Sequence, residues 1–171
     1  WSIRSPATPI TSSEPMIEFI VQLTAATATD LDRIGPKAAN LAALTRAGLP
    51  TPGGFCLSAG AYRAQIAALG LDDLVRRFGA AAMAEQRRLS VEIRLGLHEQ
   101  PIVPEILDPL LAAWNMQRRA SGGPSAVRSS ALIEDRKGAN FAGQFESFLG
   151  IHHEAAFLTA VRLIMLVAFP L

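Results

Sequence analysis

The chain has 171 residues, half of them hydrophobic, and carries 16 Lys and Arg against 15 Asp and Glu. This length corresponds to about one domain of ordinary size, and the near-neutral charge excludes the strongly basic surface typical of nucleic-acid-binding proteins. The single cysteine, Cys56, excludes an intramolecular disulfide and a cysteine-based zinc cluster. A chain without disulfides is typical of the cytoplasm, which is the location we predict.

The two ends of the sequence differ from its middle. Residues 1–15 are rich in Pro, Ser and Thr without apolar periodicity, which predicts a disordered leader. Residues 155–171 are almost entirely apolar. Because a membrane-spanning helix needs about 20 apolar residues, a buried helix is the better interpretation, and we predict no membrane partner. We also expect a fragment of a longer protein, with residues 163–171 exposed and prone to association.

The first third of the sequence predicts a strand, a helix and a second strand. Residues 17–23 are short and rich in β-formers. Residues 31–48 then carry apolar side chains at helical spacing and end in the glycine that precedes Leu-Pro, a typical helix stop. A Pro- and Gly-rich turn at residues 50–54 precedes a short apolar strand that contains Cys56, which we expect in the core.

From residue 58 to residue 119 the pattern is helical almost throughout. Ser58 can cap a helix that ends at Gly70, and another helix begins directly afterwards. Residues 80–97 combine alanines with charged side chains, which indicates an exposed amphipathic helix with a solvated charged face. Pro104 can open a further helix at a position where a proline costs nothing.

The pattern changes again at residue 121, where a Ser-Gly-Gly-Pro sequence interrupts the helical periodicity. The segments that follow are a short strand with its edge at residues 125–130, a polar loop at 131–143, an alternating strand at 144–151 and a helix at 153–166. We therefore predict an α+β fold in which a mostly helical segment, residues 59–119, is inserted between β-containing flanks.

The first segment with potential chemistry surrounds Lys37, which lies behind a glycine turn at the start of a predicted helix. A lysine ammonium and the amides of a helix start both offer positive potential and donors to a phosphate. The G-x-x-x-x-G-K-[ST] pattern of a P-loop is not present. By itself, this segment fits an ordinary solvated lysine more often than a ligand site.

The second segment surrounds Arg128, at the end of a predicted strand and followed by two serines. An arginine in this position suits bidentate contact with a phosphate. The small residues of the following loop, among them Gly138 and Gly143, allow backbone amides to approach a ligand closely. A hairpin-like connection with Arg128 in a structural ion pair explains the composition equally well.

Taken together, the two segments resemble the ATP-binding domain shared by phosphoenolpyruvate synthase, pyruvate phosphate dikinase and rifampicin phosphotransferase. The family pattern is roughly GGKxANL, AGLPVPPGF and AVRSSATAEDxxxASFAGQxET. Its counterparts here are Lys37-Ala-Ala-Asn-Leu, Ala47-Gly-Leu-Pro-Thr-Pro-Gly-Gly-Phe, Ala126-Val-Arg-Ser-Ser-Ala and Phe141-Ala-Gly-Gln. These segments occur in the family's order and at compatible distances, and the resemblance covers about residues 17–162.

The resemblance implies that residues 16–171 form part of an ATP-grasp domain: its first lobe, with a helical insertion. Such enzymes pass a phosphoryl group from ATP through a phosphohistidine to pyruvate, or to an antibiotic in the rifampicin enzymes. By similarity, Lys37 holds the ATP phosphates and Arg128 is the catalytic residue that neutralises their charge during transfer. Gly143 and Ser147 would contact the nucleotide through backbone and hydroxyl groups. Lys37 and Arg128 should therefore converge on one anionic pocket.

The resemblance also implies partners outside this chain. The Mg²⁺ ligands are expected in a second ATP-grasp lobe, and a phosphohistidine domain is expected elsewhere. His98, His152 and His153 match no phospho-carrier motif and are expected on the surface. The isolated chain should bind ATP weakly and transfer no phosphoryl group, because Mg²⁺ has to bridge the phosphates during transfer.

Departures from the family pattern leave a second interpretation open. Pro36 replaces the second glycine of the family turn, Leu132 and Ile133 replace Thr-Ala, and Ser147 replaces a threonine but keeps its hydroxyl. Pro36 removes a backbone N–H just before the lysine. The alternative is therefore a truncated, non-catalytic remnant that binds nucleotide weakly or serves as an interaction module.

Overall fold

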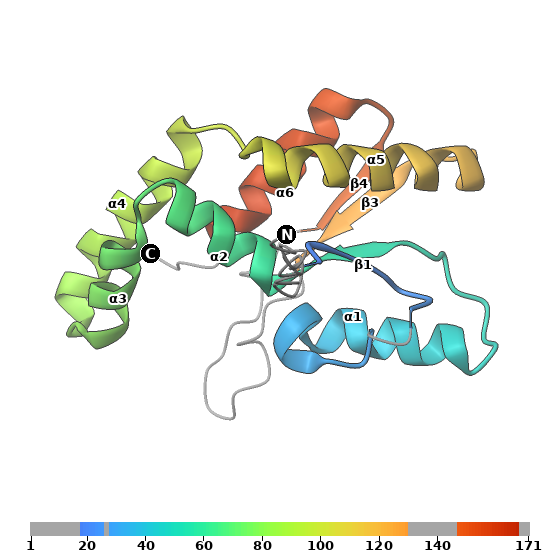
Figure 1. The fold of residues 1–171 in the computed structure, drawn as a ribbon, viewed down its shortest axis with the longest axis horizontal. Coiled ribbons are helices and arrows are strands. Elements are labelled where there is room, and N and C mark those ends of the chain that lie inside the picture. Colours follow the sequence, from blue (N-terminus) through green and yellow to red (C-terminus); the bar gives the residue numbers. More distant parts are fainter. Residues whose placement is uncertain (1–17, 26–27, 130–146, 168–171) are drawn as a thin grey trace, which may run out of the picture.

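The computed structural model describes residues 18–25, 28–129 and 147–167, and shows a mixed α and β architecture (Figure 1). Its elements are β1 (Ile20–Gln22), α1 (Leu31–Arg46), β2 (Phe55–Leu57), α2 (Ala59–Ala68), α3 (Asp72–Ala80), α4 (Met83–Glu99), α5 (Pro104–Ser121), β3 (Ser125–Arg128), β4 (Ser147–Ile151) and α6 (Glu154–Val167). The predicted insertion of helices between β-containing flanks is confirmed, because α2 to α5 separate β2 from β3.

The described strands form two antiparallel pairs. β1 pairs with β2, so that Val21 lies opposite Cys56, and β3 pairs with β4, so that Arg128 lies opposite Ser147. The strand predicted at residues 144–151 is confirmed from Ser147 onward. Its first three residues, the loop at 131–143 and the leader at 1–15 lie outside the described residues.

The helix boundaries follow local capping chemistry. The Ser58 hydroxyl accepts a hydrogen bond of 3.3 Å from the Ala61 amide and caps α2, as predicted. Pro104 opens α5, and Gly122, with φ +64°, ends it in the left-handed conformation. The predicted amphipathic helix is α4: Arg88 pairs with Glu85 and Glu92 in solvent, while the opposite face buries Leu89, Ser90, Ile93 and Leu97.

The main core lies between α5, α6 and the two strand pairs. Its fully buried members include Ile106, Leu110 and Trp114 of α5, and the Trp114 ring stacks on Phe157 of α6 with ring centroids 4.9 Å apart. Cys56 packs against a second cluster beneath α1, which supports its predicted place in the core.

The apolar sequence near the carboxyl end forms α6, a packed helix. No helix in the described part of the chain is long and apolar enough to cross a membrane. The expectation that residues 163–171 lie exposed is wrong for Met165 and Leu166, which are 7% and 8% exposed. The reason is that α6 packs on α4 and α5, so this surface is already covered within the chain. Residues 168–171 lie outside the described ranges.

Two polar side chains hold the connection between α4 and α5 in place. Arg162, the charged residue within the apolar segment of α6, donates hydrogen bonds to the carbonyls of His98 and Gln100 at the end of α4. Gln65 of α2, only 2% exposed, donates to the Pro101 carbonyl at 2.9 Å and accepts from the Val103 amide at 3.0 Å. Buried amide side chains satisfied on both atoms fix a connection without leaving an unpaired polar group.

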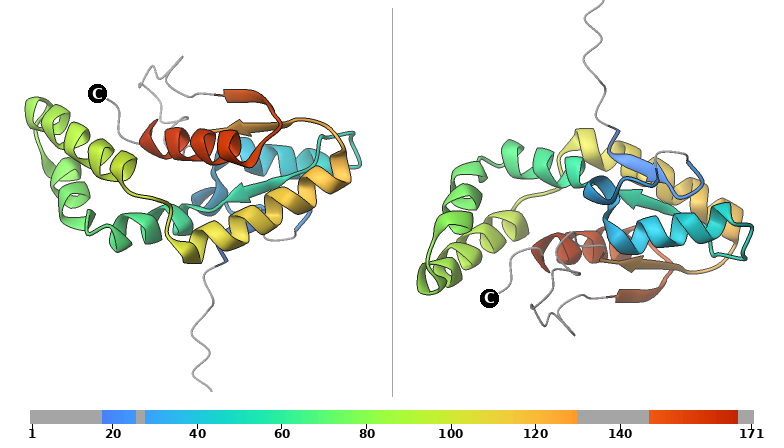
Figure 2. Two further views of the ribbon diagram at one scale, coloured as in Figure 1. Left: turned by 90° about the horizontal axis from the view of Figure 1, so that it is seen from above. Right: turned by 90° about the horizontal axis from the view of Figure 1, so that it is seen from below.

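The helices α3 and α4 form a hairpin, here called the arm, at one end of the long axis of the molecule (Figure 1). Both further views in Figure 2 show the arm extending away from the two strand pairs. A separate apolar cluster, which includes Leu71, Ile93, Leu97 and Leu166, joins the arm to α2 and α6. The two segments with potential chemistry, around Lys37 on α1 and Arg128 on β3, lie on the other side of this junction.

Candidate functional site

The helix that carries Lys37 is interrupted one residue before a proline. Gly35 has φ 76° and ψ 164° inside α1, a backbone conformation that is essentially restricted to glycine. Pro36 follows and begins the regular part of the helix, where a missing N–H breaks no helical hydrogen bond. The unbroken helix predicted over residues 31–48 is therefore corrected to a kinked helix that ends at Arg46, and Pro36 is compatible with this geometry.

The β1–β2 pair packs against α1 at the kink. Ile34, just before the break, is buried together with Val21 and Leu23, and the Cys56 thiol lies 3.6 Å from the Ile34 carbonyl oxygen. Lys37, two residues after the break, is exposed. Gly35 adopts its positive-φ conformation without steric strain because it has no Cβ, and the packed sheet fixes the backbone just before the exposed Lys37.

A charged contact fixes the first turn of α1. The Arg33 guanidinium lies 2.7 Å from a Glu18 carboxylate oxygen and also donates to the Glu18 carbonyl at 3.1 Å. This pair joins the start of α1 to the residues before β1. Because the pair is partly exposed, we assign it a positioning role and only a small contribution to stability.

The second functional segment lies at the carboxyl end of β3. Arg128 and Ser147 are both exposed and occupy facing positions on neighbouring antiparallel strands. Side chains at facing positions on one sheet face are about 5 Å apart at their Cβ atoms. The acidic residues of the connection that follows Arg128, residues 130–146, lie outside the described residues, so a structural ion pair of Arg128 with this connection stays an alternative.

The structure therefore brings two of the four predicted site residues together. The amino-terminal end of α1 and the carboxyl end of β3 both lie toward the middle of the long axis (Figures 1 and 2). The convergence of the Lys37 and Arg128 charges on one ligand stays a prediction. Gly143 lies outside the described residues. The glycine turn expected before Lys37 is present at Gly35, and it interrupts the helix that the apolar spacing had extended unbroken over residues 31–48.

A model of one protein family matches most of the chain. This family, described as the AMP/ATP-binding domain of pyruvate phosphate dikinase, matches residues 31–169. The chain belongs to this family. The matched region contains all four predicted site residues, Lys37, Arg128, Gly143 and Ser147.

Curated relatives of this pyruvate phosphate dikinase-type domain agree with the assignment. The chain is 41% identical to a phosphoenolpyruvate synthase of Neisseria meningitidis over 136 residues, or 72% of the chain. It is 29% identical to the phosphoenolpyruvate synthase of Escherichia coli over 159 residues, or 88% of the chain. It is 34% identical to a rifampicin phosphotransferase of Streptomyces sviceus over 130 residues, or 73% of the chain. These matches span 17%, 20% and 15% of the relatives' own lengths.

The three histidines and the described acidic residues were also compared with metal-binding arrangements. His98, His152 and His153 are exposed, as predicted. No group of three or more His, Cys, Asp or Glu that could hold a metal ion occurs in residues 18–25, 28–129 and 147–167.

The buried thiol behind the kink gives a testable pH dependence. Burial raises the pKa of Cys56 from 9.0 to about 11. Near pH 8 the folded protein should thus hold about 100-fold less thiolate than an ordinary cysteine, and alkylation by iodoacetamide should be slower by a similar factor than in urea. Because folding raises this pKa, the associated stability is intact below about pH 9 and is lost as the pH approaches 11. Equal alkylation rates in the folded and unfolded chain would contradict this.

Proposed function

We propose that this domain is the first lobe of an ATP-grasp-type nucleotide-binding unit and that Lys37, Arg128, Ser147 and Gly143 contact the phosphates of ATP. The observation that carries the proposal is the pairing of Arg128 with Ser147. An exposed guanidinium, without an ion pair among the described residues, faces a hydroxyl across two strands. In a member of an AMP/ATP-binding family, such a pair fits an anionic ligand better than a structural role.

The chemistry of the three described residues is electrostatic. Arg128 offers a planar pair of N–H donors, which suits two oxygens of one phosphate, and the Ser147 hydroxyl can donate to the same group from the neighbouring strand. Lys37 offers an ammonium group from the first turn of the restarted helix, and the amino-terminal end of this helix also favours negative charge. These groups bind and orient the phosphates and oppose the build-up of negative charge, without forming a bond to phosphorus themselves.

For the complete protein we propose phosphoryl transfer from ATP, through a phosphohistidine, to pyruvate. The support is the 41% identity to a phosphoenolpyruvate synthase. The 34% identity to a rifampicin phosphotransferase keeps an antibiotic acceptor as the second candidate. Mg²⁺ is part of this proposal for the complete protein, as a group that screens phosphate charge. An assay of AMP and phosphate release with pyruvate or rifampicin as acceptor separates the two candidates.

The binding role of Arg128 can be tested by substitution in the 171-residue chain. Arg128→Ala should weaken ATP binding by roughly 10- to 100-fold, because charge-assisted hydrogen bonds contribute about 1.5–3 kcal/mol. The ATP affinity of Arg128→Lys should lie between those of the parent and of Arg128→Ala, because lysine keeps the charge but loses the bidentate geometry. Affinity is measured by amide chemical shifts in a titration with ATP, which remains usable when binding is weak.

The matched control for this experiment is Arg87→Ala. Arg87 is also exposed but lies on α4, in the arm, away from the candidate site. Its removal changes net charge by the same amount and should leave ATP affinity within about twofold. The binding proposal for Arg128 is overturned if Arg128→Ala and Arg87→Ala weaken ATP binding equally.

A further inference from the structure

A second basic feature lies at the opposite end of β3 from Arg128. The carboxyl end of α5, the loop that follows it and the turn between β4 and α6 enclose a solvent-open hollow of about 430 Å³. Its lining residues are Arg118, Arg119, Gly122, Gly123, Pro124 and His152. Arg128 lies four residues after Pro124 along the strand, a distance of about 13 Å in an extended chain. The hollow is therefore distinct from the proposed nucleotide site.

The lining carries positive charge without a compensating carboxylate. The side chains of two arginines that are consecutive in α5 and of one histidine line the hollow, and no acidic residue does. Among the described residues, neither Arg118 nor Arg119 forms an ion pair. An anion in the hollow would therefore meet positive charge from α5 without a competing carboxylate among the lining residues.

One of the two arginines is held in place by the core. The guanidinium carbon of Arg118 lies 4.9 Å from the centroid of the Trp114 ring. Trp114 is 2% exposed and stacks on Phe157, so the surface beneath the guanidinium is rigid. A cation over a fixed aromatic face loses less conformational freedom when it binds a ligand than a freely rotating side chain does.

Gly122 and Gly123 expose their backbone to the hollow. A Cβ atom added at Gly122 would meet no atom within 4 Å, so the space beside this residue is open. The Gly122 amide bonds to the Arg118 carbonyl, whereas the Gly123 amide has no hydrogen-bond partner within the described part of the chain. Guanidinium groups together with a backbone N–H form a donor set that suits a tetrahedral oxyanion.

We propose that this hollow binds phosphate, as the free ion or as an exposed phosphate group, at a site separate from the nucleotide site. The competing explanation is that Arg118 and Arg119 only complement the negative end of the α5 dipole, as basic residues in a last helical turn do. That role requires no ligand. Because the hollow is open to water, the affinity should be in the millimolar range.

The test is a titration of the protein with inorganic phosphate at constant ionic strength, followed by the amide shifts of Gly122, Gly123 and His152. Saturable shifts are expected, and the double variant Arg118→Ala with Arg119→Ala should bind at least about 10-fold more weakly. Arg119→Ala alone should also weaken binding, while leaving Arg118 on the Trp114 ring. This single variant keeps the test valid if the double variant is poorly folded.

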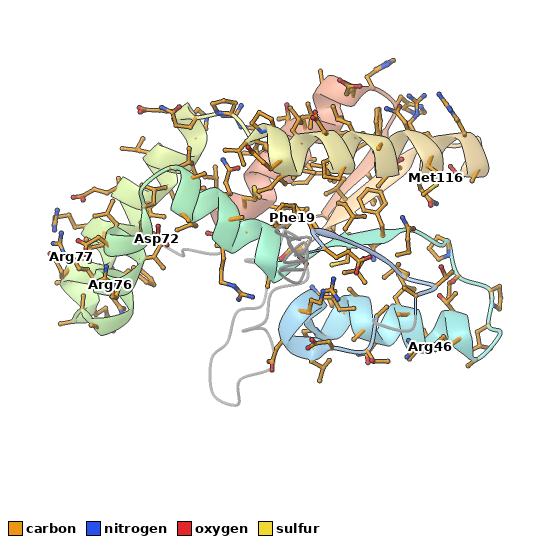
Figure 3. The ribbon with its side chains drawn as sticks, in the orientation of Figure 1. Phe19, Arg46, Asp72, Arg76, Arg77 and Met116 are labelled. Carbon is orange, nitrogen blue, oxygen red and sulfur yellow. The ribbon has the colours of Figure 1, made fainter. Side chains whose placement is uncertain are left out.

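The chain offers a matched control in a second adjacent arginine pair. Arg76 and Arg77 lie on α3, at the opposite end of the long axis from Met116, which precedes Arg118 by two residues (Figure 3). They pair with Asp73 and Glu85. The double variant Arg76→Ala with Arg77→Ala should leave phosphate binding unchanged. The proposal is wrong if the shifts do not saturate, if both double variants weaken binding equally, or if Arg128→Ala abolishes these shifts.

Discussion

Replacing Trp114 with alanine should lower the free energy of unfolding by about 4 kcal/mol. The Trp114 ring is 2% exposed, sits among the buried residues of the main core and stacks on Phe157. Alanine would leave a cavity that the surrounding helices and strands cannot fill, and it would also remove the ring beneath Arg118. Urea unfolding followed by circular dichroism measures the loss.

The control for this prediction is Trp114→Phe. The indole Nε1 is buried and has no hydrogen-bond partner among the described residues. Phenylalanine keeps most of the aromatic ring and removes no hydrogen bond seen in the structure, so it should cost less than about 2 kcal/mol. If alanine and phenylalanine destabilise the protein equally, the ring does not hold the main core together as described.

Replacing Gln65 with alanine should cost about 3 kcal/mol of unfolding free energy, the second largest effect we expect. The substitution leaves the Pro101 carbonyl and the Val103 amide without the partners that Gln65 supplies. Each buried polar group that loses its partner costs about 1–3 kcal/mol. The loss should appear as a lower urea midpoint with an unchanged dependence on denaturant concentration.

Two further substitutions separate hydrogen bonding from packing. Gln65→Leu keeps the volume but not the hydrogen bonds, so it should be nearly as destabilising as alanine. Gln86→Ala, on α4, removes one partly buried hydrogen bond of 3.3 Å to the Phe78 carbonyl and should cost less than about 1 kcal/mol. A Gln65→Leu variant as stable as the parent would show that packing alone explains this position.

The helices of this domain could be predicted from the sequence because their boundaries depend on local chemistry. Ser58 caps the start of α2, Pro104 begins α5 and Gly122 ends α5. Each of these residues acts within a few residues of its own position. The role of Gln65 could not be predicted in this way. Its partners lie 36 and 38 residues further along the chain, so nothing near Gln65 in the sequence indicates them.

The candidate site, too, could be predicted from the sequence only in part. Arg128 and Ser147 were identified from the family resemblance and lie at facing positions, since strand pairing is regular at that point. A glycine turn before Lys37 was expected, but its effect on the helix was not, because the apolar spacing of residues 31–48 continues across Gly35. Only the buried contacts of Ile34 and Cys56 behind the break show that the backbone is held there.

The packing of the arm affects which part of the domain unfolds locally. No residue of α3 is buried, and among the described elements α3 packs mainly on α4. Segments with few buried contacts exchange their amide hydrogens through local unfolding, at a free energy below that of the whole domain. The other helix of the arm, α4, buries Leu89 and Ile93 and is tied to α6 by the hydrogen bonds of Arg162. We therefore expect α3 to exchange its amide hydrogens faster than α4, while β3 and β4 remain paired.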